Sequence, residues 1–262
     1  MADPVTRVAV VTGAARGIGA ATVAALAARG WRVLATDLAD DDPALPYRLA
    51  TKDDLEKVAD LPGVRAMVAD VRDPAALETA VATAEAEWGG LDAAIAVAGV
   101  IAGGAPLWEV PPEQERAVLD VDLGGVVNLA RAAVPALLRR PAPRSGRFLA
   151  VASAAATRGL PMLAAYCAAK AGVAGLVRAL AAELGGSGVT ANAVSPGSTD
   201  TAVLAESARL YGLGSAQDFA AQQPAGRLLA PVEVAEVLAF LASPASSGMT
   251  GSVVAVDGGL AL

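Results

Sequence analysis

Thr12-Gly13-Ala14-Ala15-Arg16-Gly17-Ile18-Gly19 is the stretch of sequence that decides the fold. It follows an apolar run at residues 7–11, which predicts a strand, and it opens an alanine-rich run at residues 16–29, which predicts a helix. Glycines at such a turn let a ligand approach the backbone, and a helix N-terminus carries partial positive charge. The stretch therefore predicts a strand–helix unit whose turn binds phosphate groups.

The spacing of these glycines is G-x-x-x-G-x-G, which differs from the G-x-G-x-x-G of many dinucleotide-binding turns. A glycine cluster alone can be no more than a tight turn. Its position between the first predicted strand and the first predicted helix favours phosphate binding over that simpler interpretation.

Outward from this stretch, apolar runs alternate with amphipathic runs along the chain. Further strands are predicted at residues 31–36, 64–69, 93–97, 146–152, 189–194 and 253–256. Further helices are predicted at residues 74–88, 112–138, 163–184 and 231–241. Such alternation predicts an α/β fold, with one doubly wound parallel sheet and helices on both faces, in a single domain over residues 1–262.

Two segments do not fit the alternation. Residues 37–63 begin polar and contain three prolines, so we interpret them as an insertion. Residues 198–226 form a helical excursion, which we interpret as a substrate lid. Its larger apolar side chains either line a pocket or only pack in a core; they are Leu204, Leu210, Tyr211, Leu213 and Phe219.

The composition excludes several classes of function. The formal net charge of -7 disfavours nucleic acid and anionic membranes as partners, because both need a basic surface. The chain has no histidine, which excludes histidine-dependent triads and most zinc sites, so no metal site is predicted. Cys167 is the only cysteine and no apolar leader is visible, so we expect a cytoplasmic protein.

Two aspartates follow predicted strands, at the edge where parallel sheets bind their ligands. Asp37 ends the second strand, where a carboxylate accepts hydrogen bonds from the adenosine ribose and repels a 2′-phosphate. Arg16 would have to outweigh Asp37 to favour that phosphate. Asp70 follows the third strand and either holds the adenine amino group or caps the next helix.

Tyr166 and Lys170 lie four residues apart on a predicted helix and therefore share one face. Hydride transfer to or from a carbonyl carbon needs a partner that moves a proton. A phenol is a poor base at its ordinary pKa of about 10, and a neighbouring ammonium lowers that pKa. Ser153 ends a predicted strand, and a hydroxyl there can hydrogen-bond the substrate oxygen.

Taken together, these motifs resemble the short-chain dehydrogenase/reductase family, whose fold is Rossmann-like. The resemblance covers nearly the whole chain and includes the turn at Pro196 and Gly197 with Thr201, and the closing Asp257-Gly258-Gly259. It implies that Tyr166 is the acid/base, that Ser153 positions the substrate, and that Lys170 binds the ribose and lowers the tyrosine's pKa.

The resemblance also implies which residues bind the cofactor, NAD. These are Gly13, Arg16, Gly17, Ile18, Gly19, Asp37, Leu38, Asp70, Val71, Ala98, Gly99, Tyr166, Lys170, Pro196, Gly197, Thr199 and Thr201. Within this set, Thr201 would fix the nicotinamide carboxamide, and residues 194–197 would form the loop beneath the nicotinamide.

Two positions depart from the family pattern. The usual Asn-Asn-Ala-Gly is here Ala96-Val97-Ala98-Gly99, which keeps only the small residues that let the adenosine ribose approach. Where the family has an asparagine that completes a proton relay, this chain has Asp122. The family relay uses the backbone carbonyl there, so Asp122 can replace the asparagine, while its carboxylate beside Lys170 would alter the pKa of the tyrosine.

A closer resemblance is to the subfamily coupled to mycofactocin, a peptide-derived redox carrier. It rests on residues 45–51 (Leu-Pro-Tyr-Arg-Leu-Ala-Thr), the following Asp53-Asp54-Leu55, and residues 103–108 (Gly-Gly-Ala-Pro-Leu-Trp). It implies that NAD stays bound and is reoxidised by the carrier, with the insertion near the adenosine half. The simpler alternative is a surface loop of no functional consequence.

We therefore expect NAD-dependent interconversion of a secondary alcohol and a ketone. One alternative is an NADPH-dependent 3-oxoacyl-thioester reductase, which Asp37 opposes. Another is a catalytically dead, NAD-binding regulatory protein, which only the change at Asp122 supports. The resemblance also implies a homotetramer in which the helices at 112–138 and 163–184 pair across two-fold axes; burial within the monomer is the alternative.

Overall fold

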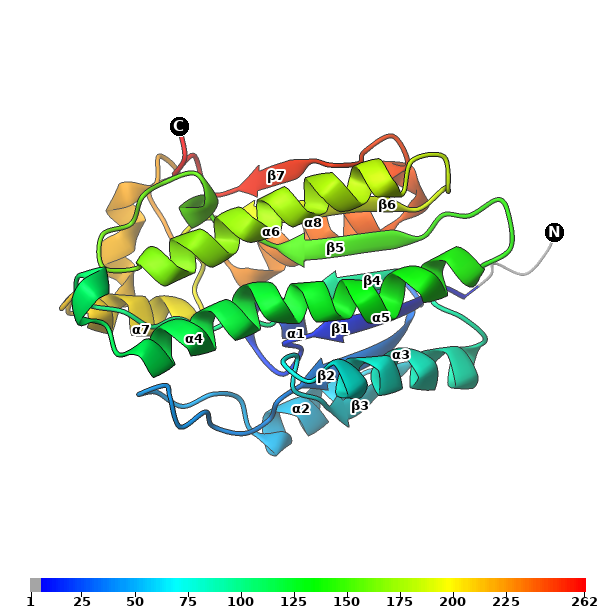
Figure 1. The fold of residues 1–262 in the computed structure, drawn as a ribbon, viewed down its shortest axis with the longest axis horizontal. Helices are drawn as coiled ribbons and strands as arrows, with labels where there is room; N and C mark the ends of the chain where they lie inside the picture. Colours follow the sequence, from blue (N-terminus) through cyan, green and yellow to red (C-terminus); the bar gives the residue numbers. More distant parts are fainter. Residues whose placement is uncertain (1–5) are drawn as a thin grey trace.

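The computed structural model describes residues 6–262 and contains one parallel sheet of seven strands, in the order β3-β2-β1-β4-β5-β6-β7 (Figure 1). The strands are β1 (Val8–Thr12), β2 (Arg32–Asp37), β3 (Val64–Val68), β4 (Ala93–Ala96), β5 (Arg147–Val151), β6 (Thr190–Pro196) and β7 (Val253–Val256). Strand order reverses between β1 and β4, and ligands of such sheets bind at this switch point. The predicted α/β class and all seven predicted strands are confirmed.

Helices cover both faces of the sheet, as predicted. One face carries α1 (Gly17–Ala27) and α8 (Pro231–Ala242), which pack against each other over a core of aliphatic side chains. The other face carries α3 (Pro74–Trp88), α5 (Gly125–Arg139) and α6 (Ala164–Glu183). The core is mostly alanine, valine and leucine, as the 3% aromatic content requires.

The predicted insertion at 37–63 is only partly an insertion. Its second half forms α2 (Lys52–Ala59), the ordinary crossover helix between β2 and β3, which begins at a capping box between Thr51 and Asp54. The helix is short and buries only Leu55 and Val58, so its period is weak in the sequence. The extra chain is therefore residues 38–51, here named the strap.

The predicted helix at 112–138 is interrupted. It consists of α4 (Pro112–Leu119), a π-helical turn at Asp120–Gly124 and then α5. π-turns of this kind insert an extra residue into a helix and often occur at functional sites. Asp122 lies in the centre of this turn.

The predicted lid at 198–226 contains α7 (Ala202–Leu210) and a 3₁₀ helix at Ala216–Gln222. Figure 1 shows this segment, in yellow and orange, at the end of the sheet to which the strands point. Shorter 3₁₀ turns lie at Leu107–Glu109, Ala154–Ala156 and Pro244–Ser246. The lid thus lies over the carboxyl edge, where the predicted site residues gather.

Two helical segments, Pro112–Arg139 and Ala164–Glu183, are long and apolar enough to cross a membrane by length and composition alone. In this fold both segments cover one face of the sheet. Core helices commonly reach the same length and hydropathy, so these helices are weak evidence for a membrane span.

Candidate active site

A cavity of about 1030 Å³ opens at the carboxyl edge of the sheet. Every residue predicted above for catalysis or cofactor binding lines it, from Gly13 at the N-terminal turn to Thr201 in the lid. Its volume lies at the upper end of the roughly 300–1,000 Å³ of ordinary ligand pockets. It is large enough for an extended cofactor together with a small substrate.

The glycine turn is held by contacts within the protein. A Cβ on Gly13 would lie 2.5 Å from Ala98 Cα, and one on Gly19 would lie 1.9 Å from the Gly13 carbonyl oxygen. Gly17 has φ +56 and faces Thr201 of the lid, whose Cγ2 would lie 3.3 Å from an added Cβ. Close packing therefore requires glycine at positions 13 and 19, in addition to any approach of a phosphate.

The N-terminus of α1 is suited to an anion. Its N-cap residue, Arg16, makes no side-chain capping bond, and the first turn contains no acidic residue. The first N–H groups of this helix therefore lack a side-chain partner and face the cavity that the glycine turn lines. These features fit the pyrophosphate of a dinucleotide.

Asp37 lies beside the glycine turn. Its Oδ2 accepts a hydrogen bond from Ala15 N at 3.0 Å, and its Oδ1 accepts a longer one from Ala39 N at 3.3 Å. The carboxylate is fixed at the end of β2 and lines the cavity. It presents negative charge where the sequence analysis expects the adenosine ribose.

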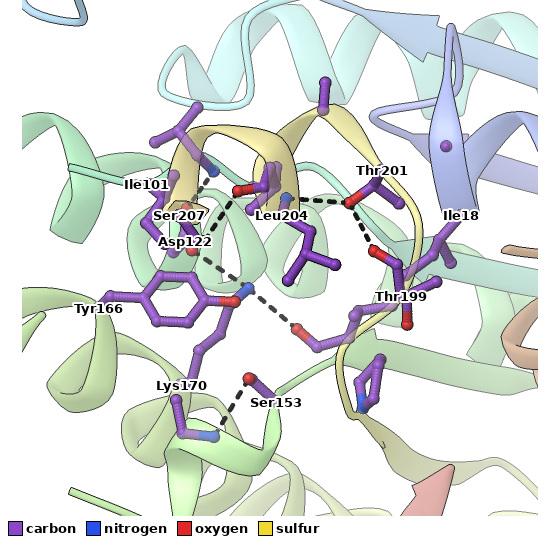
Figure 2. A pocket seen from close by; sticks show the side chains of 18 of the residues that line it. Ile18, Ile101, Asp122, Ser153, Tyr166, Lys170, Thr199, Thr201, Leu204 and Ser207 are labelled. Carbon is purple, nitrogen blue, oxygen red and sulfur yellow. Dashed lines mark hydrogen bonds and ion pairs between the residues drawn. The ribbon is translucent and has the colours of Figure 1, made fainter. Parts of the chain in front are cut away.

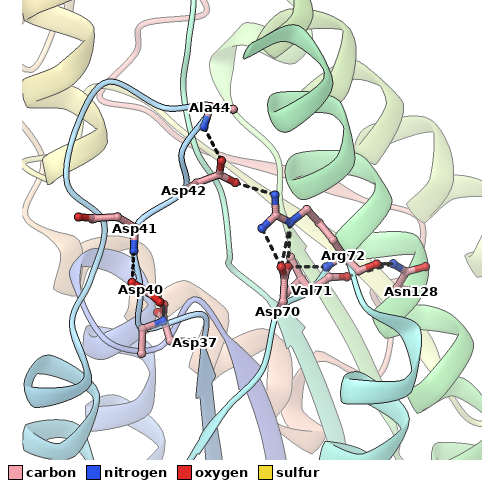
Figure 3. Close-up of polar contacts among 10 residues, drawn as sticks. Asp37, Asp40, Asp41, Asp42, Ala44, Asp70, Val71, Arg72 and Asn128 are labelled. Atoms are coloured by element: carbon pink, nitrogen blue, oxygen red, sulfur yellow. Dashed lines mark hydrogen bonds and ion pairs between the residues drawn. The ribbon is translucent and has the colours of Figure 1, made fainter. Parts of the chain in front are cut away.

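Asp70 is bound to an arginine. Its carboxylate accepts hydrogen bonds from Arg72 Nε at 3.0 Å and Nη2 at 2.7 Å, while Arg72 Nη1 donates to the strap residue Asp42 at 2.6 Å (Figure 3). Partial burial raises the pKa of Asp70, but the Arg72 hydrogen bonds outweigh it and lower the pKa overall. The alternative role as helix cap is wrong, because Asp73 caps α3 through Ala75 N.

Ser153, Tyr166 and Lys170 meet at the other end of the cavity (Figure 2). Ser153 follows β5, and its Oγ accepts a hydrogen bond from Ala155 N at 3.1 Å. Tyr166 lies in the first turns of α6, and Lys170 Nζ lies 5.5 Å from the centre of its ring. Lys170 is 4% exposed and donates to the Val151 carbonyl at 3.2 Å. The helix thus places an ammonium directly beside the phenol.

Asp122 forms a buried ion pair with Lys170. The side chain of Asp122 is fully buried, and its Oδ2 lies 3.2 Å from Lys170 Nζ without hydrogen-bond geometry. Its Oδ1 accepts a hydrogen bond from Val100 N at 2.7 Å. Burial raises the pKa of Asp122, opposed by the Lys170 charge and the Val100 hydrogen bond.

The charges of this cluster oppose one another. Burial lowers the pKa of Lys170, but the negative charges of Asp122 and Tyr166 outweigh burial and raise the pKa overall. Burial raises the pKa of Tyr166, and the Lys170 charge opposes that rise while the Asp122 charge adds to it. The departure from the family pattern at Asp122 therefore keeps Lys170 charged and makes the phenol harder to ionise.

The strap reaches into this cluster through Tyr47. The Tyr47 hydroxyl accepts a hydrogen bond from Ile101 N at 2.9 Å, next to the Val100 N–H that binds Asp122. Arg16 Nη1 also donates to the Arg48 carbonyl at 3.1 Å. Burial raises the pKa of Tyr47 well above its usual range. No pattern in the sequence marks Tyr47, which occurs there only as one letter of the subfamily stretch.

The lid is fixed by polar contacts at both ends. Thr201 Oγ1 accepts from Leu204 N and caps α7. Gln223, which the sequence does not mark, accepts from Ser198 N at 2.7 Å and is almost fully buried.

Four of the five apolar lid residues singled out above line the cavity, namely Leu204, Tyr211, Leu213 and Phe219. Leu210 is not among the lining residues. It packs against the loop at Gly104, where an added Cβ would lie 3.1 Å from Leu210 Cδ2.

Proteins similar to this chain are oxidoreductases. A family model described as enoyl-(acyl carrier protein) reductase matches residues 13–261. A cis-4-hydroxycyclohexanecarboxylate dehydrogenase of Sinomonas cyclohexanicum is 42% identical over 259 residues, covering 97% of this chain and 96% of the relative. A 3-oxoacyl-[acyl-carrier-protein] reductase of Escherichia coli is 32% identical over 256 residues, covering 97% of each.

A solved structure extends this similarity to three dimensions. The carveol dehydrogenase of Mycobacterium avium, solved in complex with NAD, has a TM-score of 0.90 and 31% identity, over 97% of each chain. Its fold and the order of motifs along this chain agree with the family resemblance seen in the sequence. The chain belongs to the short-chain dehydrogenase/reductase family of oxidoreductases.

Proposed function

We propose that this protein is an NAD-dependent dehydrogenase that interconverts a secondary alcohol and a ketone. The observation that carries the proposal is the convergence of Ser153, Tyr166 and Lys170 in one cavity with the glycine turn. A phenol beside an ammonium supplies the acid/base that such a reaction needs. The intact cluster also argues against a catalytically dead, NAD-binding regulatory protein.

In the oxidative direction, the Ser153 hydroxyl holds the substrate oxygen and the Tyr166 phenolate accepts the hydroxyl proton. When bound, the nicotinamide ring takes the hydride that leaves the carbinol carbon. Lys170 stabilises the phenolate through its charge, and Asp122 keeps Lys170 protonated. In the reductive direction, Tyr166 returns the proton to the carbonyl oxygen.

The charges around the adenosine end support NAD over NADP. Asp37 lines the cavity, and Arg72 is already paired with Asp42 and Asp70. A 2′-phosphate would meet a carboxylate there. The alternative, an NADPH-dependent 3-oxoacyl-thioester reductase, shares the activity named for several relatives, but Asp37 opposes its cofactor.

The substrate end of the cavity supports an apolar alcohol. Leu160, Leu204 and Phe219 line it together with other side chains of the lid. The named relative from Sinomonas acts on a ring alcohol, and a saturated ring fits such a wall. We therefore include secondary alcohols of saturated rings in the proposal.

The strap supports a tightly held cofactor. Its bonds from Tyr47 to Ile101 and from Arg16 to Arg48, and its ion pair from Asp42 to Arg72, fix it beside the adenosine end. We include retention of NAD, with reoxidation by mycofactocin, in the proposal on the strength of the subfamily stretch. We also propose that the protein is a cytoplasmic homotetramer.

The substitution Tyr166→Phe tests the activity, because it keeps the ring and removes the proton-carrying hydroxyl. The unaltered protein, with NAD and a panel of ring alcohols, should form the ketone. In the variant, kcat should fall by about 10²–10⁴-fold, while NAD binding stays within a factor of a few. Near-normal turnover by Tyr166→Phe would remove Tyr166 from the mechanism, and absence of turnover by the unaltered protein on every alcohol would contradict the proposed reaction.

A further inference from the structure

Arg158 is a cation in the wall of the cavity that neither the acid/base cluster nor the cofactor assignment uses. It lies in the loop between Ser153 and Tyr166, just after the 3₁₀ turn at Ala154–Ala156. Its side chain lines the cavity, and Nη1 donates to the Leu260 carbonyl at 2.7 Å. The guanidinium is thus held at a defined place between this loop and the C-terminal segment.

The charge of Arg158 is uncompensated. Within residues 6–262, no carboxylate lies within 4.0 Å of its guanidinium nitrogens. The other two cations that share the chemistry of the cavity wall and have ion-pair partners are Arg72, which pairs with Asp42 and Asp70, and Lys170, which pairs with Asp122.

The surroundings of Arg158 are apolar. Leu160, Leu213 and Phe219 line the same part of the chain's cavity wall. A guanidinium offers a planar pair of donors that matches a carboxylate, and it keeps its charge at every physiological pH. A wall that combines apolar side chains with one unpaired guanidinium suits an apolar body that carries one carboxylate.

The position of Arg158 sets the spacing that such a substrate needs. Its backbone lies beside the reacting group, because the sulfur of Cys167, the residue after Tyr166, donates to the Arg158 carbonyl at 3.7 Å. Its side chain leads away toward Leu260. A hydroxyl held at Ser153 and a carboxylate held at the guanidinium must therefore be separated by several bonds.

We propose, on the basis of the function proposed above, that the substrate is a hydroxy acid and that Arg158 binds its carboxylate. The carboxylate lies across a ring or several bonds along a chain from the hydroxyl that is oxidised. Arg158 is then the residue that selects an acid over a neutral alcohol of the same shape.

The test compares cis-4-hydroxycyclohexanecarboxylate with cis-4-methylcyclohexanol, which replaces the carboxylate by a methyl group. In the unaltered protein with NAD, kcat/KM should be higher for the acid. Arg158→Gln should lower kcat/KM for the acid by about 10- to 100-fold, mainly through KM, and leave the neutral alcohol within twofold. Arg158→Lys should restore part of the loss.

Arg29→Gln is the matched control, because it removes the same charge from an exposed arginine on α1 that pairs with Glu236. It should leave both substrates unaffected. An equal loss on the acid and the neutral alcohol in Arg158→Gln, or no loss on either, would overturn the assignment of Arg158 and leave the proposed dehydrogenase in place.

A binding measurement keeps the two proposals separable. Cyclohexanecarboxylate has no hydroxyl to oxidise, so its binding to the protein with NAD present, followed by calorimetry, does not depend on turnover. It should bind the unaltered protein at least tenfold more tightly than Arg158→Gln, while cyclohexanecarboxamide binds both alike. If no alcohol turns over, the proposed function fails, and this binding difference still decides the role of Arg158.

Discussion

At residue 122, one carboxylate oxygen in place of an amide nitrogen changes the charge of the whole acid/base cluster. Asp122 is fully buried and lies 3.2 Å from Lys170, so it acts where charges are weakly screened. It supports the ionised Lys170 and opposes the ionised Tyr166. Its effect on the reaction is the difference between two opposing influences.

Asp122→Asn should move the acidic limb of the oxidation rate to lower pH by about one unit, or on the order of 1 kcal/mol. The Asp122 charge raises the pKa of Tyr166, so its loss lowers that pKa and the phenolate forms at lower pH. The measurement is kcat against pH in the alcohol-oxidising direction. Lys170→Met, which removes the charge that stabilises the phenolate, should move the limb the opposite way.

A limb that moves to higher pH in Asp122→Asn would mean that Lys170 loses its proton without Asp122. A limb that does not move would mean that Asp122 is protonated in the unaltered protein. A complete loss of activity would show that the carboxylate itself takes part in the chemistry. Each of these results contradicts the ion pair as described above.

Asp37→Ala should narrow the preference for NAD over NADP, because the carboxylate beside the ribose position is removed. The unaltered protein should favour NAD in kcat/KM, and the variant should gain on NADP and lose on NAD. Arg16→Ala serves as control, since loss of a cation near this end should weaken NADP further. Equal use of both cofactors by the unaltered protein would show that Asp37 does not select.

Residues whose chemistry depends on local sequence could be placed before the structure was known. Ser153, Tyr166 and Lys170 follow from a strand end and a helical spacing, and all three line the cavity. Tyr47 and Gln223 could not, because each acts through a backbone amide far away in the chain, at Ile101 and Ser198. A side chain that binds distant backbone leaves no spacing in the sequence.

At the scale of elements, long periodic segments were predicted well and short ones were not. The helix α2 was read as part of an insertion, because eight mostly charged residues bury only Leu55 and Val58. The π-turn at Asp120–Gly124 was invisible, since one extra residue in a long helix hardly disturbs its apolar pattern. Tertiary packing, which sequence patterns do not record, decides both features.

Tyr47→Phe should loosen the strap and speed release of bound NAD. The change removes the hydroxyl that accepts from Ile101 N and leaves a buried N–H unpaired, at a cost of about 1–3 kcal/mol. Mass spectrometry of gently purified protein should find less NAD in the variant, and stopped-flow release should be about tenfold or more faster. Tyr211→Phe, which removes a lid hydroxyl bonded to the Pro161 carbonyl, is the matched control and should retain NAD.

If the unaltered protein exchanges NAD freely, the strap does not retain the cofactor and the carrier-coupled reaction loses its structural support. If Tyr47→Phe and Tyr211→Phe release NAD equally fast, the strap has no special role in retention. Reoxidation of bound cofactor by an artificial electron acceptor, without added NAD, would extend the test to turnover.

At the scale of the whole molecule, α6 is apolar on a face that the monomer leaves open. Its exposed residues are mostly small, and they are Ala164, Ala168, Ala171, Gly175, Ala179 and Ala182, with Arg178 and Glu183 beside them. A second copy of the helix can approach closely over small side chains. This face supports the proposed homotetramer.

Gly175→Arg should break that assembly without unfolding the monomer, because a Cβ at Gly175 meets nothing within 4 Å. Light scattering at micromolar concentration should give a tetramer for the unaltered protein and dimers or monomers for the variant. Gly175→Ala, which adds one methyl group, should stay tetrameric. A monomer for the unaltered protein would reject the assembly and mean that these helices serve only the monomer's own core.

The two neighbouring amides of Val100 and Ile101 connect distant parts of the molecule. One binds the Asp122 carboxylate and the other binds the strap through Tyr47. Coupling between two such contacts is reciprocal: whatever free energy the closed strap lends to the ionised Asp122–Lys170 pair, the pair lends equally to strap closure. In the proposed enzyme, the residence time of the cofactor therefore depends on the protonation state of the acid/base cluster, so cofactor release and catalysis share one pH dependence.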